Sequence, residues 1–271
     1  MAFEATKLTE NIGTEVRAAN PEALLNPESA AELRRLLVER GVLVFKRIDL
    51  ADEQQVRLAA LMGSVRDEGV NGIFKVTIDP KVNKAGEYLK GSFLWHMDGT
   101  HDQVPVFASL LSGKTLSDVG GETEFANTYK AYEELPDEMK RSIDGLKVIH
   151  SVAYSMSQAG LPTPPDYRPD ELNSTDKVHN LVWTHKSGRK SLVIGCHASH
   201  VVGVDLEEGR ALIRELIEWT TQPRFVYRHH WDVGDLLIWD NTGVLHRAEP
   251  YPLESGRVMH RTTLLGEEAF A

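Results

Sequence analysis

The sequence has little cysteine and no long apolar run. Its single cysteine, Cys196, cannot form an internal disulfide and is typical of a protein from a reducing compartment. No stretch approaches the ~20 consecutive apolar residues that a membrane-spanning helix needs. The first four residues lack the basic start and apolar block of a signal peptide. We therefore expect a cytoplasmic protein with no membrane partner.

An excess of positive charge is also absent. The 271 residues include 30 Lys and Arg against 40 Asp and Glu, which gives a formal net charge of −10. This balance disfavours a phosphate backbone as partner, so we expect no nucleic acid. No internal repeat, low-complexity tract or linker divides the chain. Because 41% of the residues are hydrophobic, we expect one domain over residues 1–271 with a substantial core.

Local signals mark several helices and strands. Asn26 and Pro27 before an apolar periodic stretch, with Gly41 after it, predict a helix that ends at Arg40. A buried strand is expected at 42–45 and a helix at 52–62. Further strands are expected at 72–78, 191–194, 225–230, 236–239 and 258–265, a polar loop at 79–91, and helices at 127–144, interrupted by Pro136, and at 206–221.

Residues 156–178 stand apart because they hold four prolines and show no convincing period. Such long surface excursions often cover a functional site, so this segment is a candidate lid. The many short strands with helices between them predict a β-rich α+β domain, with the helices packed outside the sheets.

Histidine is the most informative residue type, because imidazole is the commonest metal ligand. On a strand, His96 and Asp98 project to the same face and can place a nitrogen and an oxygen on one ion. A second pair, His230 and Asp232, has the same spacing. The pattern alone is therefore weak, and ordinary surface or core polar residues are the better explanation of either pair taken alone.

A third ligand distinguishes the first pair. A turn at 234–235 and a strand at 236–239 lead to His246 in a second extended segment. Two histidines and one carboxylate form the facial set that binds Fe(II) and leaves three positions free. Zinc more often takes a tetrahedral set with one open position. We therefore predict an iron site made by His96, Asp98 and His246.

Three open positions suit a chelating keto acid and dioxygen. The far carboxylate of such a chelator needs a fixed cation, and Arg257 follows His246 by eleven residues, beyond a proline-rich turn. Arg261 lies four residues further on, on the same face of an extended strand. The spacing alone is equally compatible with two solvent-facing arginines.

Taken together, these motifs resemble the taurine dioxygenase family of Fe(II)/2-oxoglutarate oxygenases over roughly residues 40–268. The C-terminal third is most similar to the dichlorophenoxyacetate dioxygenases of that family. The motifs of the family are His96-x-Asp98, Gly120-Gly121-Glu122-Thr123, Gly234-Asp235-Leu236, Trp239-Asp240-Asn241, His246 and Arg257-x3-Arg261. The stretch His197-Ala198-Ser199-His200 supports the likeness to the dichlorophenoxyacetate dioxygenases.

The resemblance implies a double-stranded β-helix core, a jelly roll of the cupin type, and a homo-oligomer. It implies Fe(II), 2-oxoglutarate and O2 as cofactor and co-substrates. It assigns the iron ligands to His96, Asp98 and His246, the 2-oxoglutarate contacts to Thr123 and Arg257, and the substrate contacts to Arg261, His200 and Lys75. His230 and Asp232 fall on a strand end and a turn, away from the metal.

The implied reaction is hydroxylation of a small anionic substrate, an aryloxyalkanoate or related carboxylate, with cleavage where the hydroxylated carbon bears a heteroatom. Taurine, alkyl sulfonates or sulfate esters are the alternative substrates. Two alternatives from other classes are a barrel that binds a metal or small acid without turnover, and a zinc hydrolase. The hydrolase has no use for a buried arginine such as Arg257.

Overall fold

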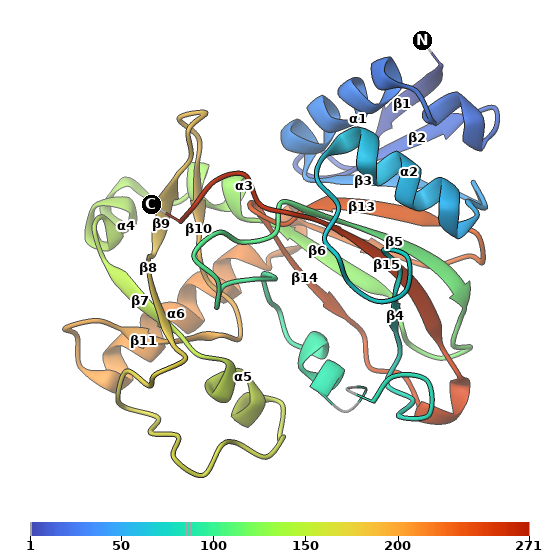
Figure 1. Cartoon of the computed structure of the whole chain (residues 1–271). Coiled ribbons are helices and arrows are strands. Elements are labelled where there is room, and N and C mark those ends of the chain that lie inside the picture. The colour runs from blue at the N-terminus through green and yellow to red at the C-terminus, as the bar shows by residue number, and fades with distance from the viewer. Residues whose placement is uncertain (1, 85, 87, 271) are drawn as a thin grey trace.

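A seven-stranded sheet is the largest unit of the fold (Figure 1). The computed structural model describes residues 2–84, 86 and 88–270. Neighbouring strands are antiparallel except for β2 and β3, which run parallel. In spatial order the strands are β1 (Phe3–Lys7), β2 (Thr14–Ala18), β3 (Val42–Phe45), β13 (Leu236–Asp240), β5 (Ala108–Thr115), β15 (Val258–Leu264) and β4 (Phe74–Val76).

The described part of the chain also contains three smaller antiparallel sheets. The first has the order β12 (Val226–His229), β6 (Thr123–Asn127) and β14 (Val244–Ala248). The second has the order β11 (Ala198–Val201), β7 (Lys147–His150) and β8 (Lys177–Asn180). The third pairs β10 (Lys190–Leu192) with β9 (Val182–Thr184).

The central strands of the large sheet bury both faces. Successive side chains of a strand point to opposite faces, so Leu43 and Ile238 join the core on the helix side, whereas Val44 and Leu237 join a different core cluster. That second cluster also contains Phe125 from β6. The sheet β12-β6-β14 therefore packs against the large sheet on the face opposite the helices.

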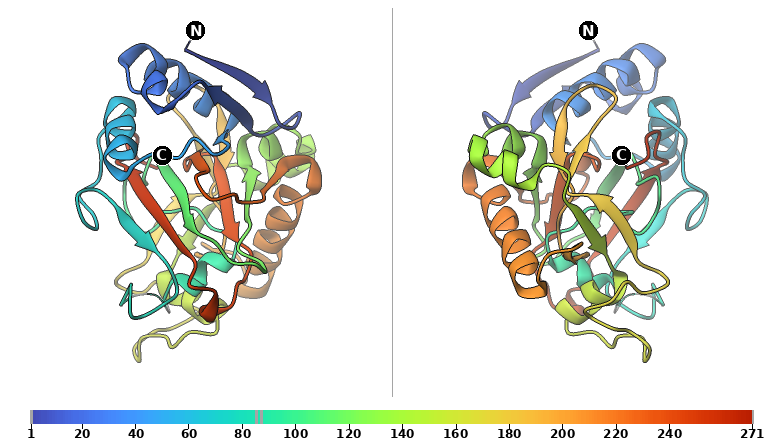
Figure 2. Two further views of the ribbon diagram at one scale, coloured as in Figure 1. Left: turned by 90° about the vertical axis from the view of Figure 1, so that its right-hand side faces the viewer. Right: turned by 90° about the vertical axis from the view of Figure 1, so that its left-hand side faces the viewer.

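Two helices cover the outer face of the large sheet, as Figures 1 and 2 show. Helix α1 (Pro27–Arg40) is capped by Asn26, whose side chain accepts from the Ser29 backbone N–H, and it ends at Gly41 with φ 78°. Helix α2 (Asp52–Met62) ends at Gly63. Both helices direct their buried leucines into the core cluster of the sheet.

The remaining helices are shorter or lie farther along the chain. They are α3 (Thr128–Glu133), α4 (Asp137–Ile143), α5 (Val152–Gln158) and α6 (Leu206–Thr220), with 3₁₀ helices η1 (Pro21–Leu24), η2 (Tyr88–Phe93), η3 (Pro223–Phe225) and η4 (Leu253–Ser255). Helix η1 packs against α1 and β2 of the large-sheet layer. Helix α6 buries Ile213 and Leu216 in a core that it shares with β7 and β11. Within the described residues, no helix has the length and apolarity needed to cross a membrane.

The expected helices at 30–40, 52–62 and 206–221 and the strand at 42–45 are confirmed. The expected helix at 127–144 is two helices, because the chain turns at Pro136. The expected strand at 72–78 is shorter, since only Phe74–Val76 pairs with β15. The stretch expected to be a loop at 79–91 contains the start of η2.

Two central strands, β5 and β6, lie where no strand was expected from the sequence. Both are almost fully buried along their length. Small polar residues such as Ser109 and Ser112 break the apolar run of β5. Strand formation there depends on pairing with β13 and β15, which are distant in the chain.

Candidate active site

Three side chains from two distant parts of the chain meet at one point of a cavity. His246 lies on β14, and His96 forms an isolated bridge to it, with hydrogen bonds in both directions between the two backbones. Asp98 follows two residues later. The expected strand through both residues is wrong, because only His96 is bridged and Asp98 lies in a turn before Gly99.

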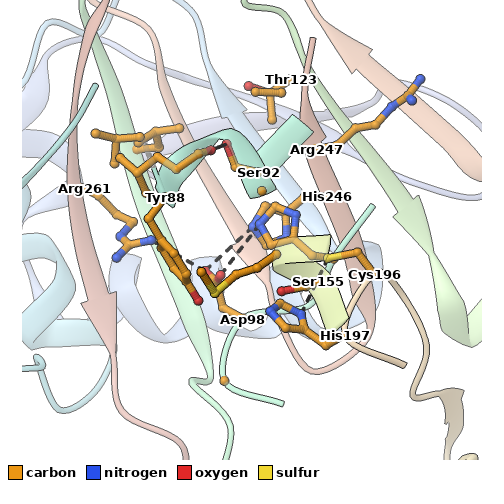
Figure 3. A pocket seen from close by; sticks show the side chains of 18 of the residues that line it. Tyr88, Ser92, Asp98, Thr123, Ser155, Cys196, His197, His246, Arg247 and Arg261 are labelled. Atoms are coloured by element: carbon orange, nitrogen blue, oxygen red, sulfur yellow. Dashed lines mark hydrogen bonds and ion pairs between the residues drawn. The ribbon is translucent and has the colours of Figure 1, made fainter. Parts of the chain in front are cut away.

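The turn still brings the Asp98 carboxylate to the imidazole of His246 (Figure 3) and to that of His96. Oδ1 of Asp98 lies 3.7 Å from Nε2 of His96, and Oδ2 lies 3.7 Å from Nε2 of His246. One ligand atom from each residue lies within 4.8 Å of the others. The three atoms therefore converge on one point, as a shared metal ion requires.

Hydrogen bonds prepare this set for a metal. Nδ1 of His96 lies 2.8 Å from the Leu94 carbonyl oxygen, an acceptor only, so Nδ1 carries the proton and Nε2 keeps its lone pair. Asn241 holds Asp98 through its backbone, since Oδ1 accepts from the Asp98 N–H at 2.9 Å and Nδ2 donates to the Asp98 carbonyl at 2.7 Å. The Trp-Asp-Asn motif thus contributes a residue that positions Asp98.

The charges of the set also suit a cation. Burial and the neighbouring His96 lower the pKa of His246, so the imidazole is neutral and can coordinate. Burial alone raises the pKa of Asp98, but its surroundings, in which Arg261 supplies the permanent positive charge, outweigh burial and hold that pKa well below its usual range. The site therefore offers two neutral nitrogens and one carboxylate.

Arg257 is a nearly fully buried cation that lines the same cavity, with 3% of its surface exposed. Nη2 donates to the Gly121 carbonyl at 3.0 Å, and the guanidinium lies over the Tyr251 ring. Among the described residues, no carboxylate oxygen lies within 4.0 Å of it. A guanidinium buried without a paired anion is costly, so these surroundings fit an anionic ligand.

The two glycines before Thr123 make room for this arginine. A Cβ at Gly121 would lie 2.9 Å from Nε of Arg257, and a Cβ at Gly120 would lie 2.0 Å from the Pro250 carbonyl oxygen. Both glycines have positive φ. Only glycine therefore allows this close approach, which brings Arg257 beside the segment that leads into Thr123.

Arg261 on β15 lies at the metal end of the cavity. Nη1 is 3.7 Å from Oδ2 of Asp98, and Nη2 is 3.5 Å from Oε2 of Glu68. Thr263 donates to the other oxygen of Glu68. Glu68 was not predicted from the sequence, because nothing local marks a carboxylate whose partners lie almost 200 positions away.

Apolar side chains form much of the remaining wall. They come from β4, β5, η2, α5 and the residues after α5, and the main contributors are Val76, Tyr88, Leu89, Leu111, Met156 and Leu161. Trp239, Cys196, His197 and Tyr251 also line the cavity. Tyr88 and Leu89 were missed because they lie in a polar stretch. Their apolar character within that stretch was the available signal.

Two expected substrate residues lie elsewhere. His200 does not line the cavity; Nδ1 of its ring contacts the Ser199 hydroxyl. Lys75 is exposed on β4 and also lies outside the cavity lining. His230 and Asp232 have largely exposed side chains, and Asp232 pairs with Lys46 at 2.8 Å. The structure thus brings together six of the eight expected site residues: His96, Asp98, Thr123, His246, Arg257 and Arg261.

Comparison with known proteins gives consistent matches. The family model described as taurine catabolism dioxygenase TauD, TfdA family, matches residues 4–263. Alpha-ketoglutarate-dependent 2,4-dichlorophenoxyacetate dioxygenases from Cupriavidus pinatubonensis and Burkholderia sp. are 37% and 36% identical, over 91% and 90% of this chain and 91% and 88% of theirs. A crystal structure of AAD-2 with Mn(II) and N-oxalylglycine matches with a TM-score of 0.86 and 33% identity over 100% of both chains. The chain therefore belongs to the TauD/TfdA family of dioxygenases.

Proposed function

We propose that this Fe(II)- and 2-oxoglutarate-dependent dioxygenase hydroxylates an aryloxyalkanoate at the carbon next to the ether oxygen. The observation that carries the proposal is the cavity itself, in which a two-histidine, one-carboxylate set lies beside an arginine and an apolar wall. Such a wall packs against an aryl ring, and the arginine binds a carboxylate by donating hydrogen bonds to it. Relatives that share over a third of this sequence carry an aryloxyacetate in their names.

His96, Asp98 and His246 are the proposed iron ligands. Their donor atoms fit a facial set, because the fixed tautomer of His96 and the neutral His246 leave lone pairs facing the Asp98 carboxylate. When bound, Fe(II) with 2-oxoglutarate supplies the activation of O2 that no side chain of the cavity can perform.

Arg257 and Thr123 are the proposed 2-oxoglutarate contacts. Thr123 lies at the end of the cavity away from Asp98 (Figure 3), and Arg257 donates to Gly121, two residues before it. A buried guanidinium and a buried hydroxyl in this region suit the far carboxylate of the co-substrate. Arg261, beside Asp98, is the proposed contact for the acidic group of the substrate. The two arginines then hold the two acids at fixed positions, which determines the C–H bond that reacts.

The overall reaction balances without further reagents. One oxygen atom of O2 enters the substrate and the other enters succinate, which forms with carbon dioxide from 2-oxoglutarate. The hydroxylated carbon of an aryloxyacetate is a hemiacetal, so its C–O bond to the ring breaks. The products are a phenol and glyoxylate.

Phenol and succinate release tests the proposal directly. The purified protein with Fe(II), 2-oxoglutarate and O2 is assayed with aryloxyacetates, aryloxypropionates, aliphatic carboxylates and sulfonates at equal concentrations. We expect one phenol per succinate with an aryloxyalkanoate and a higher kcat/KM for it than for the other acids. Succinate release that no aryloxyalkanoate stimulates would contradict the proposed substrate.

Taurine or an alkyl sulfonate is the second candidate substrate, because the matching family model is described by taurine catabolism. A sulfonate also carries an anionic group that Arg261 accepts. The short chain of taurine would make few contacts with an apolar wall, so the cavity lining favours an aryl or long alkyl substrate. Sulfite release in the same assay distinguishes this candidate.

Several broader features are part of the same proposal. The large sheet and the sheet β12-β6-β14 would form the double-stranded β-helix of a single domain over residues 1–271. Residues 156–178 would act as a lid; this assignment is supported by Met156 and Leu161, which line the cavity. We also propose a cytoplasmic homo-oligomer that binds neither nucleic acid nor membranes.

A further inference from the structure

Trp231 contacts the cavity through one residue. Nε1 of Trp231 donates a hydrogen bond to Oγ1 of Thr123 at 3.0 Å. Thr123 lines the cavity and is 4% exposed, whereas Trp231 does not line it. In Figure 3, Thr123 lies at one end and Asp98 at the other, with His246 between them. Trp231 therefore acts on the end of the cavity that is remote from Asp98.

The direction of this hydrogen bond determines what the hydroxyl can do. An indole N–H only donates, whereas a threonine hydroxyl has one hydrogen to donate and lone pairs that accept. Because Trp231 donates, the Thr123 oxygen accepts and its own hydrogen points elsewhere. Within residues 2–84, 86 and 88–270, no protein acceptor receives that hydrogen. The hydroxyl is therefore prepared as a donor to an anion.

Arg257 lies beside the same segment. Its Nη2 donates to the carbonyl oxygen of Gly121, two residues before Thr123, and it has no carboxylate partner among the described residues. A cation and a hydroxyl donor on one wall form a site for a carboxylate. Trp231 belongs to this site because it sets the donor role of the hydroxyl.

The indole is held in place from several sides. The ring of His229 packs edge-on against Trp231, with 4.8 Å between centroids. Nε2 of His229 lies 2.9 Å from Oδ2 of the fully buried Asp235, and Nδ1 lies 3.0 Å from the hydroxyl of Tyr227. On β5, a Cβ at Gly113 would lie 3.2 Å from Cε3 of the indole. These contacts leave Trp231 little freedom to turn away from Thr123.

We propose that Trp231 is a positioning residue for 2-oxoglutarate. Its N–H holds the Thr123 oxygen as an acceptor, so the Thr123 O–H donates to the far carboxylate of 2-oxoglutarate beside Arg257. The inference rests on the proposed roles of Thr123 and Arg257, but it does not depend on the prime substrate. A donor oriented before binding loses less freedom when the ligand arrives.

The variant Trp231→Phe tests this, because it keeps a ring and removes the N–H. The matched control is Trp219→Phe on α6, which removes an indole N–H donated to the Ala131 carbonyl at 2.9 Å, away from the cavity. Binding of 2-oxoglutarate to the Mn(II)-loaded protein without O2 is measured by calorimetry. We expect Trp231→Phe to weaken binding about fivefold to tenfold, the size of one typical hydrogen bond between neutral groups. We expect Trp219→Phe to bind as the parent does.

A double variant determines whether the effect passes through Thr123. Thr123→Val removes the hydroxyl, and we expect adding Trp231→Phe to it to cause no further loss of affinity. We also expect 2-oxopentanoate, which lacks the far carboxylate, to bind Trp231→Phe and the parent equally. Parent-like 2-oxoglutarate binding in Trp231→Phe, or fully additive losses in the double variant, would overturn the proposal.

Kinetics separate positioning from a merely structural role. In Trp231→Phe, we expect the KM for 2-oxoglutarate to rise by the same factor as the dissociation constant, with kcat at saturation within about twofold of the parent. A structural role would lower Tm and kcat without this selective change in KM. If the parent turns over no aryloxyalkanoate, the proposed substrate fails, while the binding measurements still decide the role of Trp231.

Discussion

Arg257 and Arg261 lie four residues apart, yet their surroundings differ. Arg257 is buried and contacts a backbone carbonyl, with no carboxylate partner among the described residues. Arg261 lies between the carboxylates of Asp98 and Glu68. Under the proposed function, the first arginine binds 2-oxoglutarate and the second binds the prime substrate.

Replacing each arginine by alanine should therefore affect different ligands. We expect Arg257→Ala to retain iron and to weaken 2-oxoglutarate binding by about 2–5 kcal/mol, because a desolvated charge pair is lost. Arg261→Ala should raise the KM for the prime substrate more than that for 2-oxoglutarate. Calorimetry and steady-state kinetics check both, with His246→Ala as the control that loses bound iron. The opposite order of effects would mean that the two roles are exchanged.

Asp240 is a buried carboxyl whose ionisation destabilises the fold. It is 1% exposed, and its Oδ1 accepts from the Thr242 N–H and hydroxyl. Burial raises the pKa of Asp240 to about 6. An unfolded aspartate titrates near pH 3.9. The stability that this group contributes is therefore complete below about pH 4 and is lost as the pH rises through 6.

We expect Asp240→Asn to be more stable than the parent at pH 8 by about 2–3 kcal/mol and to lose that advantage by pH 4. Asparagine keeps the acceptor oxygen but cannot ionise. Urea unfolding of the metal-free protein at both pH values measures the difference. Asp118→Asn, at an exposed position, is the control and should show no such change. A stability difference that does not vary with pH would refute this account.

At the scale of elements, α1 is a helix whose ends are determined locally. Oδ1 of Asn26 accepts from the Ser29 N–H at 2.9 Å, and Nδ2 donates to the Ala23 carbonyl at 3.0 Å. The helix presents Leu33 and Leu37 to the core under the large sheet. The cap stabilises the start of the helix that carries these core leucines, so it also supports the packing of the helix against the sheet.

We expect Asn26→Ala to lower the free energy of unfolding by about 1 kcal/mol, the usual cost of losing an N-cap. Asn20→Ala is the matched control, because Asn20 caps the short helix η1 at an exposed position. Urea denaturation followed by circular dichroism compares the two. An equal or larger loss of unfolding free energy in Asn20→Ala would show that the cap of α1 stabilises the protein no more than the cap of an exposed 3₁₀ helix.

At the scale of the whole molecule, Asp235 joins the two facing sheets. It is fully buried, contacts His229 of β12, and accepts from Lys46 and from the Arg47 N–H, both directly after β3. Burial alone would raise the pKa of Asp235, but the hydrogen bonds from His229 and Lys46 lower it to about 2. The folded protein therefore favours the ionised carboxylate.

We expect Asp235→Asn to lose about 2–3 kcal/mol of stability at pH 7. The lowered pKa means that this stability is present above about pH 4 and is lost as the pH falls through 2. The difference in free energy of unfolding between variant and parent, measured by urea titration, should therefore become smaller as the pH falls from 4 to 2. Asp232→Asn, which removes the exposed partner of Lys46, should cost less. A gap that stays constant down to pH 2 would contradict the assigned charge state.

The sequence by itself determined the local elements and the chemistry of the site. The cap at Asn26, the glycine stops at Gly41 and Gly63 and the turn at Pro136 act within a few residues, so spacing and residue type were enough. The metal-binding trio was also predicted from residue types together with family resemblance, because the chemistry needs those ligands in any fold.

Only the tertiary structure decided how these parts meet. Strands β5 and β6 were not recognised, because their stability comes from partners far away in the chain. Asp98 reaches His246 through a turn held by Asn241, and Trp231 reaches Thr123 across 108 positions. Such contacts depend on register and on packing between sheets, which no local spacing records.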